Sequence, residues 1–291
     1  MATVILLLIK ISIVLSVFAI GLNAKLSDTT YFLTRPVQLL KALISINVLM
    51  PVLAVLISLT FDLNPAVKIA LIVLAVSPVP PIFPNKALKA GGREDYTIGL
   101  LVSTAILSVV CIPITIALLQ QLVPVEISIS VVAILKLVLS TVLLPLLVGI
   151  LFRVVSSKVA DRIARPVGII SMVILVVSVI PVIFISARAV LTIVGDGTLL
   201  ALGAFAIVGL IVGHLCGGPE PENRPVLALA TASRHPAIAL AIAHTNFPNQ
   251  KLVAPCVLVY LILSAILAAP YLNWTKRSKP QAAGNQKHVE V

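Results

Sequence analysis

An arginine and a histidine stand side by side inside a long apolar segment, residues 228–239. Its polar side chains are those of Thr231, Ser233, Arg234 and His235, followed by Pro236. A guanidinium keeps its positive charge and presents a fork of donors, and an imidazole changes charge near neutral pH. This set of groups predicts a binding site for an anion such as a carboxylate. The alternative reading is a structural pair that donates to backbone carbonyls.

Residues 77–85 contain four prolines within seven positions, Pro78, Pro80, Pro81 and Pro84. Each proline removes an N–H donor, and its ring clashes with a carbonyl one turn back, so the helix must unwind. An unwound helix exposes N–H groups that favour anions and carbonyls that favour cations. We therefore expect Ser77 and Asn85 to face the arginine and histidine across a substrate site. A kinked membrane helix is the alternative.

The composition indicates that both segments belong to an all-α polytopic membrane protein. Of the 291 residues, 60% are hydrophobic and 11% are charged, against about 25% charged residues in soluble domains. Residues 97–125, 166–187, 197–219 and 252–275 carry no charge. Each of these stretches exceeds the roughly 20 residues that a helix needs to cross a bilayer. Residues 131–149 are apolar without alternation, which argues against barrel strands.

Nine spans are predicted near residues 3–22, 41–60, 67–85, 97–119, 130–152, 166–187, 198–216, 225–246 and 252–274. Lys and Arg number fifteen in the odd-numbered connections and the C-terminal segment, and three in the even-numbered connections. The positive-inside rule then places the N-terminus outside and the C-terminus in the cytoplasm. We expect one membrane domain, residues 1–274, in a bacterial-type cytoplasmic (inner) membrane, and a basic cytoplasmic tail, residues 275–291. The positive-inside asymmetry explains the net charge of +11, so no binding to nucleic acid is expected.

The two interrupted spans occupy matching places in the chain. The first is the third of the first four spans, and the second is the third of the last four. The second interrupted span comes five spans after the first, and this odd offset gives the two halves opposite orientations. This layout predicts an inverted repeat, with the fifth span left over, and such paired interrupted spans are typical of transporter binding sites.

No P-loop, zinc-ligand spacing, paired carboxylates or nucleophilic triad occurs in the sequence. We therefore predict that the protein is not an enzyme and has no organic cofactor. No Asp or Glu lies in the middle of a predicted span. A site for a cation would have to use carbonyls, hydroxyls and amides such as those of Asn47 and Asn85.

The chain resembles the bile acid:sodium symporter superfamily over nearly its whole length. The resemblance is carried by Met50 and Pro51, by the proline-rich span followed by residues 88–92, and by residues 222–224 leading into 227–231 and 237–241. It implies nine or ten spans with an inverted repeat of five, a panel domain and a core domain. It also implies two discontinuous helices that cross at the site, and sodium-coupled uptake of organic anions.

The positions where the resemblance places the sodium ligands carry other residues. The family's glutamate in the second broken helix falls at Ala230, and the glutamine and asparagine that follow it fall at Arg234 and His235. Its glutamine before the Met-Pro pair falls near Ile46, beside Asn47. We hypothesise that Arg234 replaces a bound cation, which leaves an uncoupled transporter, a proton-coupled transporter and an exchanger as options.

The sequence thus predicts a secondary active transporter of a small organic anion, with Na⁺ or H⁺ as the candidate coupling ion and with the lipid bilayer as its surroundings. One helix bundle would rock against the other around a substrate held by Arg234. The alternative is a non-transporting membrane sensor or partner subunit of the same fold. The sequence assigns no oligomeric state.

Overall fold

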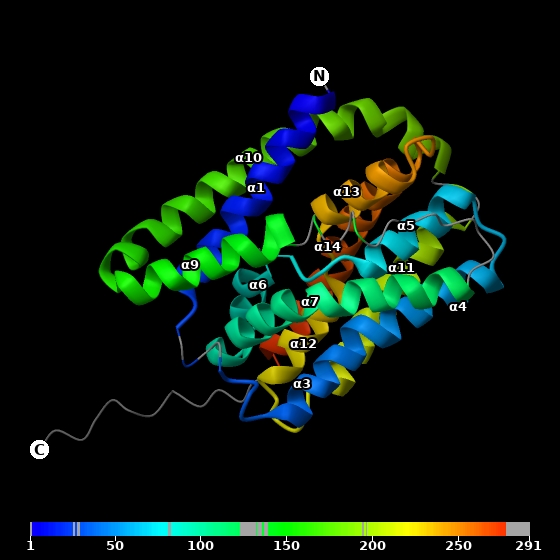
Figure 1. Cartoon of the computed structure of the whole chain (residues 1–291). Coiled ribbons are helices and arrows are strands. Elements are labelled where there is room, and N and C mark those ends of the chain that lie inside the picture. Colours follow the sequence, from blue (N-terminus) through cyan, green and yellow to red (C-terminus); the bar gives the residue numbers. More distant parts are fainter. Residues whose placement is uncertain are drawn as a thin grey trace, which may run out of the picture.

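The computed structural model describes residues 2–277, apart from 26, 28–29, 81–82, 123–131, 133–135, 137–138, 194 and 196. Within these ranges every regular element is a helix (Figure 1), which confirms the predicted all-α class. Four of the described helices are long and apolar enough to cross a membrane: Pro36–Thr60, Glu94–Leu119, Thr198–Cys216 and Val253–Arg277. Shorter apolar helices are Leu7–Asn23, Pro65–Val76 and Leu139–Val155. The chain is therefore an integral membrane protein, while the count of nine spans stays a prediction.

One group of helices consists of α1 (Ala2–Asn23), the π-helix η2 (Leu139–Leu143), α9 (Leu144–Val155) and α10 (Ser157–Ile193). Helix α1 packs against both α9 and α10 (Figure 1). Where α1 crosses α9, a Cβ added to Gly149 would lie 2.5 Å from the carbonyl oxygen of Phe18. Small residues let membrane helices approach this closely and maximise their van der Waals contact.

A second group contains the continuous helix formed by α3 (Pro36–Leu43), the π-helix η1 (Ile44–Leu49) and α4 (Met50–Thr60). It also contains α7 (Glu94–Leu122), α11 (Thr198–Cys216) and α14 (Val253–Arg277). Helix α14 extends three residues beyond the predicted end of the last span. The first of the predicted tail residues are therefore helical, and residues 278–291 lie outside the described part of the chain.

Two further helices of this second group are interrupted. Helix α5 (Pro65–Val76) ends at Ser77, whose backbone is extended, and α6 (Phe83–Lys89) follows. Helix α12 (Asn223–Ala232) ends at Ser233, and α13 (Pro236–Asn246) begins after His235. The chain thus leaves the helical conformation at both of the segments that the sequence singled out.

The prolines of these segments have two different roles. Pro78 and Pro80 lie in the non-helical segment after α5, while Pro81 lies outside the described residues. Pro84 stands in the first turn of α6, and Pro236 is the first residue of α13. The first turn of a helix needs no intrahelical N–H donor, and proline has the right φ there. Pro84 and Pro236 therefore begin the second half-helices, and their role as helix breakers stays a prediction.

The connection from α1 to α3, one of those that join the two groups, is anchored on the second group. Tyr31 and Phe32 are buried, and both rings contact the ring of Tyr96 in α7. The guanidinium of Arg35 lies 4.2 Å from the centroid of the Tyr31 ring. Burial raises the pKa of Tyr31, although Arg93 and Arg35 lower it in part. Within this connection, the ring contacts fix the part from Tyr31 onward to the second group.

Replacing Gly149 by alanine is expected to force α1 and α9 apart, because the new methyl group would meet backbone rather than a flexible side chain. Such overpacking typically costs about 1–3 kcal/mol. We expect a clearly lower melting temperature of the purified protein in detergent. Gly168→Ala in α10 is the matched control, since its Cβ would lie 3.8 Å from the Cβ of Ala19, an ordinary contact. Equal melting temperatures for the two variants would contradict the close crossing.

Candidate functional site

The two interrupted helices meet at their breaks. The backbone N–H of His235 donates to the carbonyl oxygen of Pro78 at 3.0 Å. The Ser77 hydroxyl donates to the Leu74 carbonyl at 2.8 Å and so caps the end of α5. The non-helical segments 77–80 and 233–235 therefore lie against each other, although more than 150 residues separate them in the sequence.

The guanidinium of Arg234 lies at this crossing and is directed at backbone carbonyls. Its Nη1 donates to the carbonyls of Ala75 at 3.4 Å and Ser77 at 3.3 Å, and its Nη2 donates to that of Ile46 at 3.1 Å. Arg234 is 3% exposed. The carbonyl end of a helix carries partial negative charge, which favours a cation at the end of α5. These contacts match the alternative reading of the sequence, in which the arginine bonds to carbonyls.

The carbonyl of Ile46 is free to accept because of the local helix geometry. In the π-helix η1 a carbonyl accepts from the N–H five residues later, and for Ile46 that residue is Pro51, which has no N–H. The carbonyls of Ala75 and Ser77 lack helical donors because the chain becomes extended after α5. Arg234 thus satisfies three carbonyls that proline and an interrupted helix leave without partners.

The positive charge of Arg234 has no carboxylate beside it within the described residues. The ion pairs found there join Arg93 to Asp95 and Arg153 to Asp161, both outside the crossing. The Nε of Arg234 is buried, and no hydrogen-bond partner for it occurs in the described part of the chain. A buried charge that is hydrogen-bonded but not neutralised attracts an anion.

His235 presents a second N–H donor without a partner. Its Nδ1 accepts from the backbone N–H of Ile238 at 3.4 Å, which caps α13. The proton of the neutral ring is then on Nε2, which is buried and has no partner among the described residues. The neutral ring therefore has one N–H donor, at Nε2, on the side opposite the nitrogen that caps α13.

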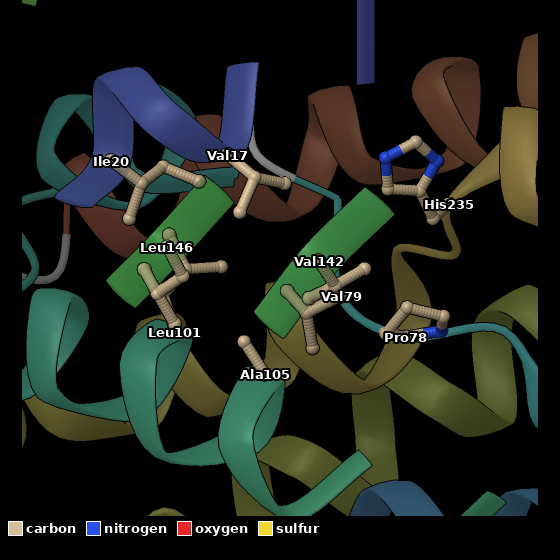
Figure 2. A pocket seen from close by; sticks show the side chains of 9 residues that line it. All are labelled: Val17, Ile20, Pro78, Val79, Leu101, Ala105, Val142, Leu146 and His235. Atoms are coloured by element: carbon tan, nitrogen blue, oxygen red, sulfur yellow. The ribbon is translucent and has the colours of Figure 1, made fainter. Parts of the chain in front are cut away.

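The ring of His235 lines a small cavity of about 20 Å³ at the boundary between the two helix groups. Figure 2 shows the ring at one edge of this cavity, with one nitrogen turned toward the aliphatic side chains. The other lining residues are Val17, Ile20, Pro78, Val79, Leu101, Ala105, Val142 and Leu146. A cavity of this size accommodates about one water molecule. The walls are apolar, so the histidine supplies the polar side chain of the cavity.

Two polar side chains that the sequence analysis missed support the crossing. The hydroxyls of Ser45, in η1, and Thr231, in α12, lie 2.5 Å apart and are both buried. The hydroxyl of Tyr260, in α14, donates at 2.5 Å to the carbonyl of Ala232. Ala232 is the last residue of α12. A buried tyrosine hydroxyl normally has a partner, and a tyrosine near the middle of an apolar span was the available signal for Tyr260.

The structure brings most of the predicted site residues together. Thr231, Arg234 and His235 are buried at the crossing together with Ser77, and Ser233 beside them is partly buried. Asn47 lies in η1, next to the carbonyl that accepts from Arg234, and is partly exposed. The side chain of Asn85 lies outside the described part of the chain. Their roles toward substrate and ion stay predictions.

The fold and the crossing define a helical membrane protein with two discontinuous helices that meet at a buried cationic site. A family model described as the sodium bile acid symporter family matches residues 10–193. The chain therefore belongs to the sodium bile acid symporter family, as its motifs predicted, and is a transporter of that kind. The second interrupted helix lies beyond the matched range. A search of curated proteins gave no match.

Tyr260→Phe is expected to destabilise the crossing, because it leaves the Ala232 carbonyl buried without its donor. An unsatisfied buried group costs about 1–3 kcal/mol. We expect a lower melting temperature and reduced transport, since Ala232 precedes the segment that positions Arg234.

The matched control is Tyr271→Phe, which removes a hydroxyl that lies 2.8 Å from Nδ1 of His214, away from the crossing. This variant is expected to transport at the wild-type rate. Equal transport by both variants would show that the Tyr260 hydroxyl does not position the site.

Proposed function

We propose that this protein is a secondary transporter of a small organic anion, which binds where the two interrupted helices cross. The observation that carries the proposal is the buried guanidinium of Arg234, which is hydrogen-bonded to carbonyls and has no carboxylate partner within the described residues. A buried charge is expensive unless it is paired. An anionic substrate supplies the missing negative charge.

The donors at the crossing suit a carboxylate. The Nε of Arg234 and the Nε2 of His235 are both N–H donors without partners in the described structure. The N-terminus of α13 begins at the next residue and adds partial positive charge. The apolar walls of the cavity beside His235 favour a substrate with an aliphatic portion.

The arrangement of the two helix groups favours alternating access. The cavity lies between α1 and η2–α9 on one side and the interrupted helices and α7 on the other. Its volume of about 20 Å³ is too small for an organic anion, so the groups must separate for the substrate to enter. Movement of one rigid helix bundle against another is a common mechanism of secondary transporters.

Arg234→Ala is expected to lower transport at least about tenfold without preventing membrane insertion. A hydrogen bond to a charged group contributes about 1.5–3 kcal/mol, and each 1.4 kcal/mol is a factor of about ten. The measurement is uptake of radiolabelled acetate, isovalerate, succinate and taurocholate by vesicles that contain the purified protein. A thermal-shift screen with the same four anions identifies those that bind.

The matched control is Arg224→Ala, because Nε of Arg224 also donates to a backbone carbonyl, that of Gly218 at 3.0 Å, but outside the crossing. This variant is expected to keep wild-type uptake. Wild-type uptake by Arg234→Ala would remove the role of the guanidinium. Binding of an anion without any flux would instead favour the sensor alternative.

A further inference from the structure

We infer that the guanidinium of Arg234 occupies a monovalent-cation site permanently, so that this member of a sodium symporter family carries its cation covalently and needs no sodium. The position of the guanidinium in a cation site is inferred from its contacts with carbonyls. The conclusion that transport needs no sodium rests on the proposed function.

Three carbonyl oxygens converge on this position from two distant parts of the chain. The oxygen of Ile46 comes from η1, and those of Ala75 and Ser77 come from the end of α5. Backbone carbonyls of this kind, freed from helical bonding, can replace the hydration shell of a monovalent cation. The hydroxyls of Ser45, in η1, and Thr231, in α12, lie within hydrogen-bond distance and hold these two helices together. The contact lies beside the one from Arg234 to Ile46, because each partner is close in sequence to one of those residues.

The guanidinium leaves no place for a free cation among these oxygens. All three carbonyls already accept from Arg234. A second unit charge about 4 Å from the guanidinium would be repelled strongly enough to weaken its binding by roughly a thousandfold at an effective dielectric of about 20. Within the described residues no group of three or more His, Cys, Asp or Glu side chains could hold a metal ion, and neither ion pair involves Arg234.

A tethered cation changes the energetics of transport. It supplies the positive charge that neutralises an anionic substrate, but it cannot enter from one side of the membrane and leave on the other. A sodium gradient therefore cannot drive the substrate through this site. The anion must instead move down its own gradient, together with a proton, or in exchange for another anion.

The first experiment compares melting temperatures of the purified protein in sodium chloride, potassium chloride and choline chloride at equal ionic strength. Wild type is expected to melt at the same temperature in all three salts. Arg234→Ala frees the three carbonyls and is expected to gain a rise of a few degrees in sodium or potassium over choline, because a ligand that binds the folded state stabilises it. Stabilisation of wild type by sodium would overturn the inference.

Two further variants separate the cation site from general effects of the substitution. Arg224→Ala removes a guanidinium elsewhere and is expected to show no response to salt identity. Arg234→Lys keeps a tethered charge, so it is expected to resemble wild type and remains informative if Arg234→Ala does not fold. A sodium response in Arg234→Lys, or none in a folded Arg234→Ala, would contradict a cation site at this position.

The second experiment measures uptake by wild-type vesicles with an inward sodium gradient and with choline in its place, using whichever of the four radiolabelled anions binds. Rates within about twofold of each other are expected. A rate that requires sodium would overturn the inference. If none of the four anions is transported but the melting pattern is as expected, the proposed function fails while the assignment of the cation position stands.

Discussion

The structure depends on backbone carbonyls that have lost their helical donors inside an apolar interior. Such groups cost several kcal/mol each when they are left without partners. Here Pro51 leaves the Ile46 carbonyl free, and the interruption after α5 leaves those of Ala75 and Ser77 free. Arg234 satisfies all three from the second interrupted helix. The same side chain therefore ties together three segments that would otherwise be unstable.

Satisfying the carbonyls does not remove the charge. The carbonyl dipoles at the end of α5 stabilise the guanidinium, but within the described chain no carboxylate neutralises it. His235 adds a donor and no negative charge. The crossing is therefore stable as a structure, and the anion binding that we propose follows from the charge that remains. In that proposal a single residue accounts for both the integrity of the site and its selectivity.

Helices pack more closely within each group than at the boundary between the two groups. Gly149 lets α9 approach the backbone of α1, and Gly213 lets α11 approach that of α12, so each group is held together by backbone contact. The boundary between the groups contains the cavity beside His235, which is lined by larger aliphatic side chains. This boundary is where we propose that the two groups separate during transport.

The sequence by itself determined the helical membrane class, the family and the two segments that cannot remain helical. These features are readable because composition and proline act locally. It also identified Arg234 but left an anion clamp and a carbonyl-bonded arginine as alternatives. Only the tertiary structure decided which carbonyls the guanidinium meets, that η1 is a π-helix, and that Ser45 and Tyr260 belong to the site. Those contacts depend on which helices lie side by side, and no local pattern encodes that.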